Sequence, residues 1–183
     1  MKGRIKIISC TLLYSIVLSC NTAKPQVTFD THIDDEIKEY VEEFIVEGKK
    51  RGFDAKPYVK IIDSIRINYD MEYGYLGLYI PKTNEKFNYF YGTVDISPIN
   101  MSSKMLLKST VFHELAHVCG YQGHPCDLCP DIMSSVTNVK PKDKDIKDKV
   151  SWDAKVDVLF KQIKGIPIED NAVRRYVEKH IRK

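Results

Sequence analysis

This sequence of 183 residues contains no long hydrophobic run and no internal repeat. Its longest mainly apolar stretch, roughly residues 7–18, is too short to span a bilayer comfortably. Hydrophobic residues make up 43% of the chain and charged residues 29%, as in ordinary globular proteins. These proportions exclude a disordered tail, a collagen-like fibre and a polytopic membrane protein, and the length fits one domain.

The chain also lacks an excess of positive charge outside its N-terminus. It has 28 Lys and Arg against 25 Asp and Glu, a formal net charge of +3. Lys2, Arg4 and Lys6 are the only charged residues among the first 19, so the remaining chain has 25 basic and 25 acidic residues. Binding to nucleic acid usually needs a clustered surplus of basic residues. We therefore expect no nucleic-acid partner.

The first 20 residues have the features of a bacterial export signal. A basic start precedes the apolar stretch, and residues 17–20 read VLSC, which resembles the lipobox of bacterial lipoproteins. The resemblance implies cleavage after residue 19, acylation of Cys20, and an anchor in a membrane of the bacterial cell envelope, on its periplasmic or cell-surface face. Several acyl chains suffice for stable anchoring. The alternative is a signal peptide or N-terminal anchor with an incidental cysteine.

After this signal over 1–19 and a tether over 20–32, the patterns predict one α+β domain over 33–183. Apolar residues on one face predict an amphipathic helix over 34–51, which Gly52 ends. Runs rich in Ile, Val, Tyr and Phe predict strands over 58–69, 75–80 and 87–96. Further helices are predicted over 102–119, 151–164 and 170–181, and the alternating charges of 140–149 predict a solvated loop or linker.

The informative stretch is residues 113–117, which read HELAH inside a predicted helix. Residues four apart differ by about 40° around a helix, so His113 and His117 can face one metal ion. Glu114 lies beside this face, where it can act as a general base on a water held by the metal. This is the HExxH arrangement of zinc peptidases, in which zinc lowers the pKa of the water to about 7.

A catalytic zinc usually has three protein ligands and one open position. His124 is the nearest candidate for the third ligand, because Gly120 ends the helix and lets the chain turn back. Three of the five histidines of the chain thus fall within twelve residues. A chance helical pattern does not account for this concentration.

The stretch from His113 to Ser134 resembles the metzincin clan of zinc metallopeptidases, which share the signature HExxHxxGxxH and a downstream methionine turn. By this resemblance Met133 would form the turn beneath the metal. It also implies a zincin-like domain with a small mixed sheet, an active-site helix and C-terminal helices, a Zn²⁺ cofactor, and a peptide or protein substrate extended along an edge strand such as 75–80.

The sequence departs from the clan at the usual position of the third ligand. That position is Gly123, which has no ligating side chain, and His124 follows one residue later. The loop must therefore contain one extra residue, or the third ligand lies elsewhere. His124 is our prediction for the third ligand, with Asp127 as the second choice.

Three cysteines remain in the domain, namely Cys119, Cys126 and Cys129. In an exported protein Cys126 and Cys129 can close a small loop, or Cys119 can pair with either of them and brace the ligand loop; one thiol stays free in both cases. In a rival interpretation, His113 and His117 join Cys126 and Cys129 in a closed structural zinc site. Such a site would leave Glu114 and the methionine turn without a role.

The sequence therefore favours a zinc-dependent endopeptidase of the bacterial envelope, in which His113, His117 and His124 hold the metal and Glu114 moves the proton. The alternative from a different class is an envelope lipoprotein that uses a structural zinc site as a binding module. A hydrolase of another kind with the same zinc geometry is a third interpretation.

Overall fold

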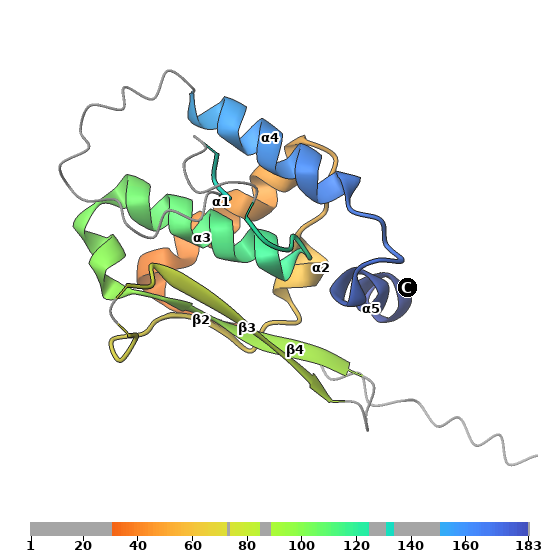
Figure 1. Cartoon of the computed structure of the whole chain (residues 1–183), viewed down its shortest axis with the longest axis horizontal. Helices are drawn as coiled ribbons and strands as arrows, with labels where there is room; N and C mark the ends of the chain where they lie inside the picture. The colour runs from red at the N-terminus through yellow and green to blue at the C-terminus, as the bar shows by residue number, and fades with distance from the viewer. Residues whose placement is uncertain (1–30, 73, 85–88, 125–130, 134–150, 183) are drawn as a thin grey trace, which may run out of the picture.

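The computed structural model of the chain describes residues 31–72, 74–84, 89–124, 131–133 and 151–182. Within these ranges a small sheet lies on one side of the molecule and the helices lie on the other (Figure 1). The strands are β1 (His32–Ile33), β2 (Ser64–Ile67), β3 (Gly77–Asn84) and β4 (Tyr89–Ile96). The helices are α1 (Asp35–Lys50), α2 (Lys56–Val59), η1 (Pro98–Ser102, a 3-10 helix), α3 (Lys104–Val118), α4 (Trp152–Gly165) and α5 (Ala172–His180).

The sheet is mixed, with the strand order β1-β2-β4-β3. β1 and β2 pair in parallel, β2 and β4 also pair in parallel, and β3 runs antiparallel to β4 at the edge. The predicted α+β class with a small mixed sheet is therefore confirmed for the described residues.

Strand β3 continues past the predicted end at residue 80, although the next residue is Pro81. Pro81 lies opposite Gly92 of β4, whose carbonyl oxygen accepts a hydrogen bond from the Asp63 N–H on the β2 side, 2.8 Å away. The pair of Pro81 and Gly92 is thus not hydrogen-bonded, and the missing proline N–H removes nothing from the sheet.

The predicted strand over 58–69 is wrong in its first half. α2 occupies residues up to Val59, and only Ser64–Ile67 form a strand. Pro57 lies in the first turn of α2, where its fixed φ favours a helix. The apolar residues that follow are buried consecutively instead of alternately. A short apolar run of this kind cannot be assigned to strand or helix by its period.

The four long helices confirm the predictions to within a few residues at each end. Three of them begin at a residue whose side chain accepts a hydrogen bond from a backbone N–H in the first turn. These residues are Ser103 for α3, Ser151 for α4 and Asn171 for α5. The start of α3 differs from the prediction because η1 occupies residues up to 102.

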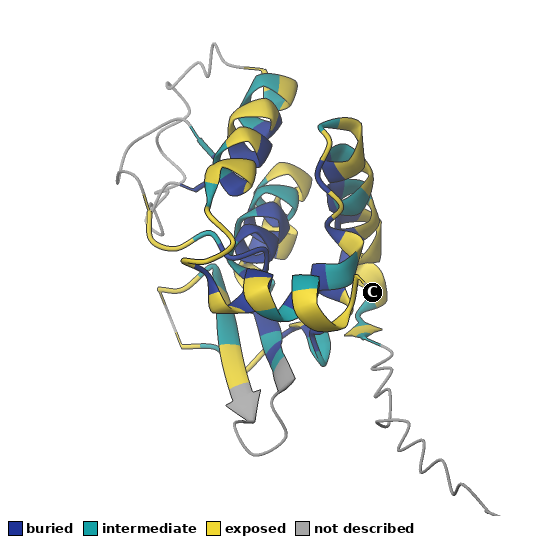
Figure 2. Ribbon diagram, turned by 90° about the vertical axis from the view of Figure 1, so that its right-hand side faces the viewer, coloured by how far each residue is buried: buried dark blue, intermediate teal, exposed yellow. Residues whose placement is uncertain are grey.

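Aromatic side chains join α3 to the two helices that cover it. The ring of Phe44 on α1 contacts Phe112 on α3 edge-on at 5.2 Å between centroids and lies 5.0 Å from Phe160 on α4. Phe112 in turn lies 5.1 Å from Trp152. Together with the sheet, these contacts bury most of α3, and the buried residues gather on the inner sides of the helices (Figure 2). α3 is therefore a rigid support for side chains.

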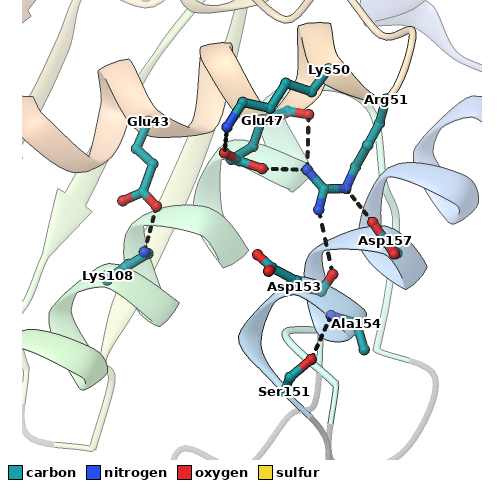
Figure 3. Close-up of polar contacts among 9 residues, drawn as sticks. All are labelled: Glu43, Glu47, Lys50, Arg51, Lys108, Ser151, Asp153, Ala154 and Asp157. Carbon is teal, nitrogen blue, oxygen red and sulfur yellow. Dashed lines mark hydrogen bonds and ion pairs between the residues drawn. The ribbon is translucent and has the colours of Figure 1, made fainter.

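Ion pairs at the rim connect the same helices (Figure 3). Arg51, just after α1, pairs with Glu47 and, at 2.5 Å, with Asp157 of α4. Lys108 of α3 pairs with Glu43 of α1 at 2.5 Å. Ion pairs in contact with solvent stabilise a fold by only about 0–1 kcal/mol each. They therefore contribute little to the stability of the helix packing.

Candidate metal centre

Three histidine side chains converge at the C-terminal half of α3. The Nε2 atoms of His113 and His117 lie 3.2 Å apart, and those of His113 and His124 lie 3.0 Å apart. One ligand atom from each ring lies within 4.8 Å of the other two. The helix brings the first two together because they are one turn apart, and the loop after α3 brings the third.

Backbone carbonyl groups orient the two helical histidines. His113 Nδ1 lies 2.7 Å from the carbonyl oxygen of Ile132, and His117 Nδ1 lies 2.8 Å from that of Tyr121. A carbonyl oxygen only accepts hydrogen bonds, so we assign the ring hydrogen to Nδ1 in both residues. In the neutral rings, both Nε2 atoms then have a free lone pair. This is the usual outer-shell arrangement of histidines that bind metals.

Burial keeps these rings neutral. Burial lowers the pKa of His113 to about 4, and the charges of His117 and His124 lower it further. The hydrogen bond with the Ile132 carbonyl acts in the opposite direction and raises the pKa, but it is the weaker effect. Burial also lowers the pKa of His117. At neutral pH neither residue carries the extra proton that would block metal binding.

The geometry and the donor set fit a tetrahedral metal ion. Zinc–nitrogen bonds of about 2.0–2.1 Å at tetrahedral angles place two ligand nitrogens about 3.3 Å apart. The two Nε2–Nε2 distances of 3.0 and 3.2 Å are close to this value. Three imidazoles suit zinc, and also copper, iron or nickel. The residues present can therefore hold a divalent ion with a fourth position open.

The loop that brings in His124 turns sharply after α3. Gly120 N–H donates to the carbonyl of His117, and the Gly120 carbonyl accepts from the Asn171 side chain of α5 at 2.6 Å. Gly123 has φ = +76°, a left-handed conformation that side chains rarely adopt. Gly123 thus forms the turn immediately before His124, whose Nε2 lies 3.0 Å from that of His113.

Glu114 lies on the side of α3 that faces β3, and its side chain is 5% exposed. Burial raises the pKa of its carboxyl group to about 8, while a hydrogen bond from the backbone of Tyr79 opposes this shift. At this pKa the carboxyl group is mostly protonated at pH 7 when no metal is bound, and a cation held by the histidines would lower the pKa toward the carboxylate form that a general base needs. The predicted general base is therefore a buried carboxyl on the residue next to His113.

The turn Asp131–Met133 lies beside the histidines, because the Ile132 carbonyl is bonded to His113. Met133 is fully buried. Its role as a methionine turn remains a prediction.

Cys119 is the only cysteine among the described residues, and it takes no part in the histidine cluster. Cys119 follows α3 as a fully buried free thiol, and burial raises its pKa, which makes it unreactive. Cys126, Cys129 and the reserve ligand Asp127 lie outside the described residues, as does Cys20.

Three groups that shape the site were not predicted from the sequence. The carbonyl groups of Tyr121 and Ile132 accept hydrogen bonds from the histidine rings and orient them. The side chain of Asn171, at the start of α5, donates a hydrogen bond to the Gly120 carbonyl. Every residue has a carbonyl group, so no residue type marks such a contact. The sequence indicates that Asn171 can cap the start of a helix, but not that its side chain contacts Gly120.

The fold and the site together define an α+β domain with a candidate three-histidine metal centre on a buried helix. Comparison with protein-family models, with curated proteins and with solved structures finds no significant match to this chain. Within the described ranges, none of the helices has the length and apolar character needed to cross a membrane.

Proposed function

We propose that this protein is a zinc-dependent endopeptidase of the metzincin type. The observation that carries the proposal is the convergence of three Nε2 atoms beside a buried glutamate. Its donor set leaves the fourth position of a tetrahedral ion free for water or substrate, as a catalytic zinc requires.

Zinc bound by His113, His117 and His124 would supply a Lewis acid that acidifies water and polarises the scissile carbonyl. Glu114 accepts the proton of the attacking water and delivers it to the nitrogen of the leaving amine. The carbonyl groups of Ile132 and Tyr121 hold the two helical rings in place during these steps. The buried surroundings of Glu114 strengthen its electrostatic interactions, because the local dielectric constant is low.

The substrate would lie along the edge strand β3. The Leu76 carbonyl accepts from the Ser97 N–H beside β4, so the main-chain groups of residues 77, 79 and 81 point to the other side. That side of β3 has no paired strand among the described residues. An extended peptide can add there as a further strand, next to Glu114, through the main-chain groups of Gly77 and the carbonyl of Tyr79, because the Tyr79 N–H already donates to Glu114. Pro81 offers a carbonyl group but no N–H, so pairing is weaker toward that end.

The rival zinc module with two histidines and two cysteines has less support. The cluster contains a third histidine, His124, 3.0 Å from His113, which that module does not use. The proposed lipid anchor at Cys20 would place the enzyme at a membrane surface, where its substrates are envelope or external proteins.

The test is the variant Glu114→Gln, which keeps the size of the side chain and removes its basicity. Purified protein loaded with zinc is incubated with a peptide library, and its zinc content is measured. We expect about one zinc per chain and cleavage slower by about 100- to 10,000-fold, the usual contribution of a general base. Glu36→Gln, on the exposed side of α1, is the matched control. Unchanged cleavage by Glu114→Gln would refute the catalytic role, and no cleavage by wild type would favour the binding module.

A further inference from the structure

Glu114 rests against a position of the edge strand that has no side chain. A Cβ atom added to Gly77 would lie 2.6 Å from both Cγ and Oε1 of Glu114, and 2.9 Å from its Cδ. Real Cβ atoms essentially never show contacts below 3.0 Å, so one of the two residues would have to move. The absence of a side chain at Gly77 therefore creates the space that the carboxyl group occupies.

Neither main chain can yield easily. β3 is paired with β4 along its length, with Leu78 opposite Asp95 and Ile80 opposite Thr93. α3 is buried between the sheet and the helices, and its neighbours Leu115 and Val111 are fully buried. The side chain of Glu114 is thus the part that a larger residue at position 77 would displace.

The same strand also binds the carboxyl group. The backbone N–H of Tyr79 donates to it, two residues after Gly77 and on the same side of β3. Gly77 thus supplies the space and Tyr79 the hydrogen bond. Both act from the free edge along which the proposed substrate would lie.

We propose that Gly77 is a positioning residue for Glu114: it lets the carboxyl group lie against the edge strand, beside the histidine face of α3. The catalytic consequence rests on the proposed function, whereas the contact itself does not. A methyl group at this position would rotate the carboxyl group away from the edge. Gly77 does not have a φ in the left-handed range, so alanine is disfavoured there by crowding alone.

The contact is tested first in metal-free protein, through thermal unfolding of Gly77→Ala in two backgrounds. With Glu114 present, we expect Tm to fall by about 3 °C or more, as for other overpacked sites. With Glu114→Ala, which removes all three crowded atoms, the same substitution should change Tm by less than about 1 °C. Gly165→Ala is the control, because a Cβ there meets nothing within 4 Å. An equal fall in both backgrounds would overturn the proposal.

The positioning role is tested next in zinc-loaded protein. We expect Gly77→Ala to retain its zinc and its KM, and to lose up to about 100-fold in kcat, as for other misplaced catalytic groups. The loss should fall on kcat at unchanged KM, because the carboxyl group is displaced while the edge strand stays in place. Wild-type kcat in Gly77→Ala, or a raised KM with unchanged kcat, would overturn the positioning role. Activity in Glu114→Gln would refute the proposed function and leave the unfolding result intact.

Discussion

The Nε2 atoms of His113 and His117 lie 3.2 Å apart, and neither can donate a hydrogen bond to the other. Each ring donates its Nδ1–H to a backbone carbonyl, so the two facing nitrogens both present lone pairs. Protonation could relieve this repulsion, but burial lowers the pKa of both rings. A cation between them relieves it at neutral pH. This pair is the strongest physical argument for a metal ion.

The first prediction concerns the third ligand. His124→Ala removes the residue that the loop brings to the helical pair. We expect the zinc affinity to fall by more than about 100-fold, because removing an outer-shell partner already costs 10- to 100-fold. Competition with a chromophoric chelator measures this. His32→Ala is the control, since the His32 side chain is 72% exposed and lies on β1. An undiminished affinity would transfer the ligand role to Asp127 or a cysteine.

The second prediction concerns Gly120, which ends α3. It has φ = +93°, and a Cβ there would lie 2.5 Å from the Asn171 side chain. Gly120→Ala should therefore destabilise the metal-free protein by about 2–4 kcal/mol, from backbone strain and crowding together. It should also weaken zinc binding, because His124 follows the turn.

Gly52 offers a matched comparison in urea unfolding. Its φ of +74° is similar, but a Cβ there meets nothing within 4 Å. Gly52→Ala should lower the free energy of unfolding by about 1–2 kcal/mol, from backbone strain alone, and leave the zinc affinity unchanged. Equal losses in the two variants would mean that the contact with Asn171 contributes nothing.

The helical half of the site was predictable because helix geometry is local. A spacing of four residues places His113 and His117 on one face in any α-helix, and the apolar pattern of 102–119 predicted that helix. The placement of His124 was predictable only in outline. A glycine permits a turn, but the left-handed conformation of Gly123 became visible only in the folded loop.

Contacts between distant segments were not predictable from the sequence. The approach of Gly77 to Glu114 depends on how the edge strand lies against α3, and no local pattern encodes it. The same holds for β1, a two-residue strand that begins at His32, inside the expected tether. α2 was missed because its short apolar run has no distinguishing period.

The third prediction concerns the N-terminus. If Cys20 is acylated, wild-type protein expressed in a bacterial host should incorporate labelled palmitate and partition into a detergent phase, because each buried methylene contributes about 0.8 kcal/mol. Cys20→Ala should lose both properties. Cys10→Ala, which changes a cysteine inside the apolar stretch, should retain them. Detergent partitioning of Cys20→Ala would instead indicate an uncleaved N-terminal anchor.

The last prediction concerns the pH dependence of stability in metal-free protein. Burial raises the pKa of Glu114 in the folded state to about 8, from about 4.5 in the unfolded chain. Between these values the folded state binds more protons, so Glu114 makes the free energy of unfolding fall as the pH rises. His113 acts in the opposite direction, since its pKa is about 4 when folded and 6.5 when unfolded. At pH 6.5 half of the unfolded His113 is still protonated, so this opposing effect ends only about one pH unit higher, and the lowered pKa of His117 acts in the same direction. The decline due to Glu114 should therefore be clearest above about pH 7.5.

From pH 6.5 to 8, this decline should reach at most about 2 kcal/mol. Urea unfolding of the chelator-treated protein at several pH values measures it. The decline should vanish in Glu114→Gln and persist in Glu36→Gln, whose residue is exposed. Zinc should also reduce it in wild type, because a nearby cation lowers the pKa of a carboxyl group. A decline of equal size in Glu114→Gln would mean that another group titrates, and that the carboxyl group is not held in the buried position beside Gly77.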